Sequence, residues 1–98
     1  MTKRFVVIEL DKTFYFIGRG RLETVENTSC YSLLFHTKDN AKRYISGRIE
    51  EIGRDHPYGI YKSLDNDGGV ITLLNEKGRV ARGVHLRIET VVEEEDAK

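Results

Sequence analysis

Apolar and polar residues alternate along the first part of the chain, a pattern typical of β-strands. Residues 4–10 and 13–17 are rich in β-branched and aromatic side chains. The polar pair Asp11-Lys12 between them predicts the turn of a β-hairpin. This pair lacks the glycine that a tight two-residue turn favours, so a slightly longer loop or a continued sheet is the alternative.

The stretch from 18 to 29 is polar and contains Gly18 and Gly20. Glycine inside a strand pattern marks a break or a bulge, so this stretch is predicted to be a mobile loop. Residues 30–35 regain strand character. Three strands are therefore expected before the first helix.

A helix is predicted between Thr37 and Gly53. Thr37 is a good N-cap residue, and Gly53 is expected to adopt the left-handed conformation after the last turn. Gly47 in the middle costs helix stability, which indicates either close backbone packing or a locally soft helix. Apolar residues at spacings of three and four predict that one face packs on a sheet. They are Ala41, Tyr44, Ile45, Ile49 and Ile52.

Three more strands are expected after the helix, over 58–64, 70–74 and 80–92. Residues 65–69 contain Asp, Asn and Gly, and residues 75–78 contain Asn and Gly, which are typical of hairpin turns. From residue 80 onward, apolar side chains occupy mainly the even positions. This alternation predicts an antiparallel strand with one buried face and one wet face.

The order β-β-β-α-β-β-β predicts an α+β fold, an antiparallel sheet of about six strands with one amphipathic helix on one face. One helix cannot cover both faces of such a sheet. Either the sheet curls toward a partial barrel, or its second face is wet or occupied by a partner. Phe14 and Tyr15 point to opposite faces, so both faces of that strand are apolar.

Composition indicates a single folded domain over residues 1–92, followed by an acidic disordered tail over 93–98. The chain has 98 residues, of which 39% are hydrophobic, and its 16 basic and 16 acidic residues cancel. Cys30 is the only cysteine, so no internal disulfide is expected and a reducing, cytoplasmic setting fits best. We read no signal peptide and no membrane span, so no membrane partner is expected.

Segments that resemble cofactor-binding or metal-binding motifs lack other residues or flanking elements that these motifs require. Asp65, Asp67 and Glu76 fit the first, third and twelfth positions of a calcium loop, but Gly69 and Val70 occupy the fifth and sixth. A calcium loop needs an oxygen ligand at the fifth position and glycine at the sixth, with helices on both sides. We therefore expect neither a metal nor a cofactor.

Catalytic groups are equally scattered along the chain. Cys30 and one of the histidines His36, His56 and His85 would make a nucleophile pair only in an electropositive, accessible setting. A lone cysteine on a strand is more often a small buried hydrophobe. The protein is therefore predicted not to be an enzyme, and a small enzyme ranks third among its functions.

The leading prediction is a small protein-binding or regulatory module that acts through an exposed sheet face or edge and is homo-oligomeric. A regulator or inhibitor of a larger enzyme, as among bacterial and phage accessory proteins, suits this size. Aromatic and arginine side chains often anchor protein interfaces. The candidates here are Tyr15, Tyr31, Tyr61, Arg82 and Arg87.

The alternative is a nucleic-acid-binding protein. Lysine and arginine neutralise phosphates, and aromatic rings on strands stack on bases. The Gly18-Arg19-Gly20-Arg21 stretch leads into no helix, so it does not predict a dinucleotide loop, but its arginines suit phosphate contacts. The candidate phosphate contacts are Arg19, Arg21, Arg43 and Arg79.

Overall fold

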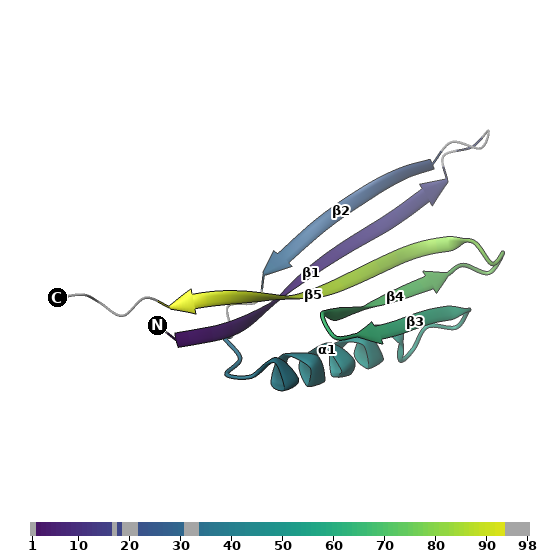
Figure 1. Cartoon of the computed structure of the whole chain (residues 1–98). Helices are drawn as coiled ribbons and strands as arrows, with labels where there is room; N and C mark the ends of the chain where they lie inside the picture. The colour runs from purple at the N-terminus through teal and green to yellow at the C-terminus, as the bar shows by residue number, and fades with distance from the viewer. Residues whose placement is uncertain (1, 17, 19–21, 31–33, 94–98) are drawn as a thin grey trace.

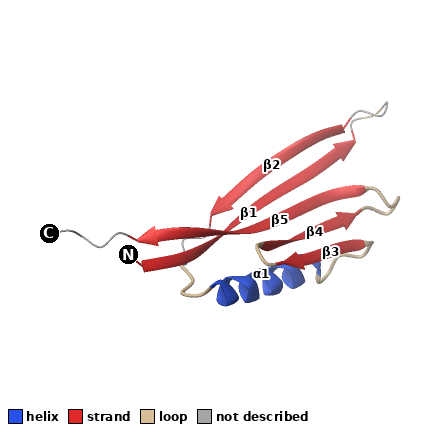
Figure 2. Ribbon diagram, in the orientation of Figure 1, coloured by secondary structure: helices blue, strands red, loops and turns tan. Residues whose placement is uncertain are grey.

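The computed structural model describes residues 2–16, 18, 22–30 and 34–93. Five antiparallel strands form one open sheet in the order β2-β1-β5-β4-β3, and one helix packs on one face, so the predicted α+β class is confirmed. The sheet does not close into a barrel, and it has five strands rather than six (Figures 1 and 2). The elements are β1 (Thr2–Phe16), β2 (Leu22–Cys30), α1 (Lys38–Gly53), β3 (Ile60–Asp65), β4 (Gly68–Leu74) and β5 (Val80–Glu93).

The hairpin predicted at Asp11-Lys12 is wrong, because β1 runs straight through both residues. Asp11 pairs with β2 on one side and with β5 on the other, and so does Lys12. Each charged side chain has an opposite charge on a neighbouring strand, Arg82 for Asp11 and Glu26 for Lys12. The two polar residues therefore lie within the strand without ending it.

The loop predicted over 18–29 is wrong for residues 22–29, which belong to the edge strand β2. The described side chains of β2 are all exposed, so they show no alternation of apolar and polar residues. The separate strand predicted over 30–35 is not found at its described ends. Cys30 ends β2, and Phe35 makes only an isolated bridge to Phe5 of β1. Residues 31–33 lie outside the described part.

The helix follows its prediction closely at the start and less closely at the end. The hydroxyl of Thr37 accepts a hydrogen bond from the backbone N–H of Asn40 at 3.1 Å, which confirms the N-cap. Gly53 is the last helical residue, and Arg54 caps the helix in the right-handed conformation, so the left-handed glycine cap is wrong. A Cβ on Gly47 would meet nothing within 4 Å, which excludes close packing there within the described chain.

The core lies between α1 and one face of the sheet. The predicted helical stripe is confirmed, since three of its residues are buried and the other two pack against them. The alternation predicted for the last strand is also confirmed in its middle, because Val84 and Leu86 are buried in this core and Ile88 packs against it. The buried core consists of Val7, Ala41, Ile45, Ile49, Ile71, Leu73, Val84 and Leu86.

The turn between β3 and β4 is shorter than predicted. The carboxylate of Asp65 accepts a hydrogen bond from the Asp67 N–H at 2.8 Å, and β4 then begins at Gly68. A Cβ on Gly68 would lie 2.0 Å from the carbonyl oxygen of Leu86. Only glycine fits at this close approach of β4 to β5. Gly68, which was predicted as a turn residue, is therefore required by the pairing of the two strands.

The helix covers only part of the sheet. It packs against β4, β5, β3 and β1, whereas β2 contacts only β1 among the described elements. Figure 1 shows the β1–β2 hairpin projecting away from the helix. The sheet face opposite α1 has no helix or loop of the described chain over its centre.

Candidate protein interface

The face of the sheet opposite α1 is called the open face below. Val7, Ile71 and Leu86 point to the helix, so their neighbours along each strand point to the open face. Strand pairing then sets residues of adjacent strands side by side. The open face is formed at its centre by Ile8, Leu10, Lys12 and Phe14 of β1, Gly83, His85 and Arg87 of β5, Val70 and Thr72 of β4, Tyr61 of β3 and Glu26 of β2.

An apolar strip runs along this face. Ile8 and Leu10 are successive open-face residues of β1, and Lys12 separates them from Phe14. Val70 lies two strands away on β4, beyond His85 of β5. All four apolar side chains are only half-buried, and α1 does not cover them because it packs on the opposite face of the sheet. Water therefore contacts a file of aliphatic and aromatic side chains, which is the kind of surface that a partner covers.

Two shallow hollows flank His85 on this face. One, of about 260 Å³, is lined by Leu10, Phe14, Val70 and Gly83 among others. The second, of about 150 Å³, lies beside it toward Arg87. A Cβ on Gly83 would meet nothing within 4 Å, so the missing side chain helps to open the first hollow. His85 itself is exposed between the two hollows.

The charges around the strip are balanced. Lys12 Nζ lies 2.8 Å from Glu26 Oε1, and Arg87 Nε lies 2.7 Å from Glu89 Oε1. Lys12 and Arg87, the cations at the centre of the open face, are thus each matched by an acid on the same face. The result is an apolar centre with a neutral polar rim, as in many protein interfaces.

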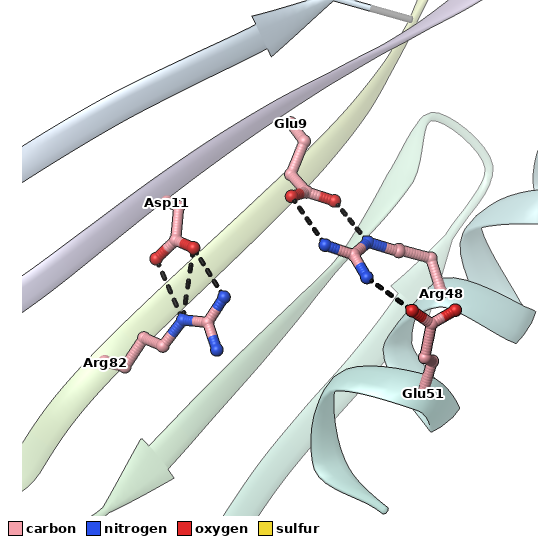
Figure 3. A network of polar contacts seen from close by, with 5 residues as sticks. All are labelled: Glu9, Asp11, Arg48, Glu51 and Arg82. Carbon is pink, nitrogen blue, oxygen red and sulfur yellow. Dashed lines mark hydrogen bonds and ion pairs between the residues drawn. The ribbon is translucent and has the colours of Figure 1, made fainter.

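A second polar cluster lies on the helix side of the sheet, where Figure 3 shows two arginines among three acids. Arg48 donates from Nε to Glu9 Oε1 at 2.8 Å and from a terminal nitrogen to Glu9 Oε2 at 3.1 Å, and it also donates to Glu51 at 2.9 Å. Glu9 is 5% exposed. This network joins β1 to the helix, and its groups are engaged with one another.

Arg82 and Asp11 form the other part of that cluster. The guanidinium donates from Nε to both carboxylate oxygens at 3.0 and 3.1 Å, and from a terminal nitrogen to one of them. The hydrogen bond to Asp11 raises the pKa of Arg82 above its ordinary value. No buried side-chain nitrogen or oxygen of the described residues lacks a hydrogen-bond partner. The pair ties β5 to β1.

The predicted interface residues are divided between the two faces. Tyr61 and Arg87 lie on the open face, and Tyr61 is 68% exposed. Tyr15 and Arg82 point to the helix side, Tyr15 at the far end of the β1–β2 hairpin. Tyr31 lies outside the described residues.

The arginines predicted to bind phosphate do not converge where the structure describes them. Arg43 lies in the N-terminal half of α1, and Arg79 precedes β5 in the turn after β4, at the other end of the sheet (Figure 1). Arg19 and Arg21 lie outside the described residues.

Sequence reasoning missed the residues at the centre of the open face, above all Gly83 and His85. The signal was present in the odd positions of the last strand. A wet face usually carries charged residues, but the odd positions from 81 to 85 are alanine, glycine and histidine. The absence of lysine, arginine and acidic residues at these positions was the signal for an uncharged centre of the open face.

Comparison with protein-family models, with curated proteins and with solved structures gave no match. Among the described residues, no helix is both long enough and apolar enough to cross a membrane. The same residues include no group of three or more histidine, cysteine or acidic side chains placed to hold a metal ion.

Proposed function

We propose that this protein is a small non-enzymatic docking module that binds another protein through the open face of its sheet. The observation that carries this proposal is the uncovered apolar strip of Ile8, Leu10, Phe14 and Val70, with a hollow beside Gly83. Binding there would bury apolar surface, which is the main source of affinity in protein association. Tyr61 at the margin supplies an exposed aromatic anchor.

The charges of the molecule also favour a protein partner. Lys12 and Arg87 at the centre of the open face are paired with acids, so this centre offers little of the uncompensated positive charge that nucleic acids require. On the helix side, Arg48 and Arg82 bond to carboxylates of β1. These groups have a structural role in joining the elements.

The test uses two valines on opposite faces. Val70→Glu puts a charge at the centre of the open face, whereas Val25→Glu puts the same charge on β2, pointing to the helix side, where Val25 is already 49% exposed. Each variant and the parent protein serve as bait, captured proteins are identified by mass spectrometry, and affinities are measured by calorimetry with purified components. The expected result is a partner that Val70→Glu loses and Val25→Glu keeps.

Equal loss or equal retention in both variants would contradict the open-face assignment. Circular dichroism of each variant shows whether the fold is intact. Fluorescence anisotropy with labelled oligonucleotides at low and physiological salt tests the alternative. Tight binding that weakens steeply with salt would replace protein docking by nucleic-acid binding.

A further inference from the structure

We propose that the partner on the open face is a second copy of this chain, packed face to face about a two-fold axis along β5, and that the dimer dissociates when His85 becomes charged. This inference rests on the docking role proposed above for the same face. The second copy is the binding partner, and the charge on His85 is the condition under which the dimer dissociates.

The position of β5 makes the open face suitable for its own copy. β5 is the middle strand in the order β2-β1-β5-β4-β3. A two-fold axis along it places β1 over β4 of the partner and β2 over β3 of the partner, so all five strands are covered. With strands about 4.8 Å apart and about eight paired residues rising ~3.3 Å each, the projected face is roughly 650 Å². Stable interfaces bury about 800 Å² of accessible surface on each side, so the open face is close to the size that a stable dimer needs.

The register across the sheet brings matching side chains together. Leu10, His85 and Val70 lie in one cross-strand row, because His85 pairs with Leu10 of β1 and with Val70 of β4. The two-fold axis then sets Leu10 over the partner's Val70 and Val70 over the partner's Leu10. These two apolar side chains therefore meet each other twice, as in a self-complementary interface.

The next row gives a polar match at the margin. Glu26, Lys12, Gly83, Thr72 and Tyr61 follow one another across the five strands. The same axis sets Tyr61 opposite the partner's Glu26, so that the phenol hydroxyl can donate a hydrogen bond to the carboxylate. Tyr61 is the most exposed of the large apolar side chains described, and this contact would cover it.

His85 lies on the axis, so the two imidazoles of the dimer meet. The hollow of about 260 Å³ beside Gly83 gives each ring room next to the partner's strand. Packed sheets are about 10 Å apart, so two charged rings there would lie close together in a region that has lost its water. Neutral imidazoles are compatible with this contact, and two imidazolium ions are not.

The charged groups around His85 do not compensate for its charge. On the open face near His85, β1 contributes Lys12, β2 contributes Glu26, and β5 contributes Arg87 and Glu89. β3 contributes Tyr61, and β4 contributes only Val70 and Thr72. Arg4 and Asp65 lie farther along β1 and β3. The helix lies on the other face. Glu26 and Glu89 are already in ion pairs with Lys12 and Arg87. Protonation of His85 therefore adds net positive charge on both sides of the axis.

Sedimentation equilibrium of the full chain at about pH 7.5 and about pH 5.5 tests the proposal. A dimer is expected at the higher pH. Its dissociation constant should rise about ten-fold at the lower pH if one ring must be neutral, and about 100-fold if both must be. His85→Gln should keep the dimer and lose this dependence. His36→Gln, a matched change at an exposed histidine before the helix, should keep both.

Three results would overturn the proposal. If the protein is a monomer at about pH 7.5 and on the order of 100 μM, it does not bind a second copy with significant affinity, and the dimer is excluded. A dimer that persists in folded Val70→Glu excludes the open face. A pH dependence that survives in His85→Gln excludes the histidine. A monomeric protein that still loses another partner through Val70→Glu would overturn the dimer and leave the docking function standing.

Discussion

Arg82 and Arg87 lie on the same strand but point to opposite faces, so the same substitution should have different effects on stability. Arg82 forms a forked ion pair with Asp11 on the helix side, and the two side chains are 35% and 23% exposed. Arg87 pairs with Glu89 on the open face, and these side chains are 57% and 46% exposed. Methionine at either position keeps an apolar stem of similar length and removes the charge.

The exposures set the expected magnitudes. Exposed ion pairs contribute about 0.2–1 kcal/mol, whereas breaking a fully buried pair costs about 3–5 kcal/mol. Arg82 is partly shielded and bonds both oxygens of one carboxylate, but solvent still screens the pair. We therefore expect Arg82→Met to lower the free energy of unfolding by about 1–2 kcal/mol and Arg87→Met by less than about 0.5 kcal/mol.

Urea unfolding followed by circular dichroism measures both values. The experiment is best done at about pH 5.5 and micromolar protein, where the proposed dimer would not be coupled to unfolding. With a slope near 1 kcal/mol/M, Arg82→Met should lower the midpoint by about 1–2 M and Arg87→Met by less than about 0.5 M. Asp11→Asn combined with Arg82→Met gives the coupling energy, expected near 1 kcal/mol. Equal midpoints for the two arginine variants would refute the reasoning.

Three further predictions follow from single sites. Gly47→Ala should raise the free energy of unfolding by about 0.5–1 kcal/mol in urea unfolding, because a Cβ there meets nothing within 4 Å; a lower stability would contradict this. Gly68→Ala should cost more than about 3 kcal/mol or prevent folding, since its Cβ would lie 2.0 Å from the Leu86 carbonyl oxygen; a native spectrum with unchanged stability would contradict this. Lys62 donates to Glu50 at 2.7 Å and lowers the pKa of that carboxyl, so Lys62→Met should raise this pKa toward its ordinary value in an NMR titration. Because the pKa of Glu50 is lower in the folded state, this ion pair stabilises the fold above the unfolded-state pKa, and the stabilisation is lost as the pH falls. A Glu50 titration that is unchanged in Lys62→Met would refute the pairing.

The helix and the last strand could be predicted from sequence because their signals are local. The Thr37 cap acts on an N–H three residues away, and the buried stripe repeats every three or four residues. The alternation of β5 is equally local. The end of the helix was harder, since Gly53 packs near Ile71 of the sheet, a contact that no nearby residue reveals.

The first two strands could not be predicted because their signals come from distant residues. Asp11 and Lys12 resemble a turn until their partners are known, and Arg82 lies 71 residues from Asp11 along the chain. β2 is an edge strand that pairs only with β1 and buries none of its described side chains. An exposed edge strand has no apolar periodicity, so it reads as a polar loop.

The error about β1 and the missed centre of the open face have one cause. If β1 had turned at Asp11, Leu10 and Phe14 would lie on different strands, and the apolar strip would not form. Because β1 continues, both side chains point to the same face beside β5. The same continuity removes one strand from the predicted sheet and leaves β5 in the middle of five. The charged pair in β1 thus determines both where the apolar strip runs and why His85 lies at the centre of the open face.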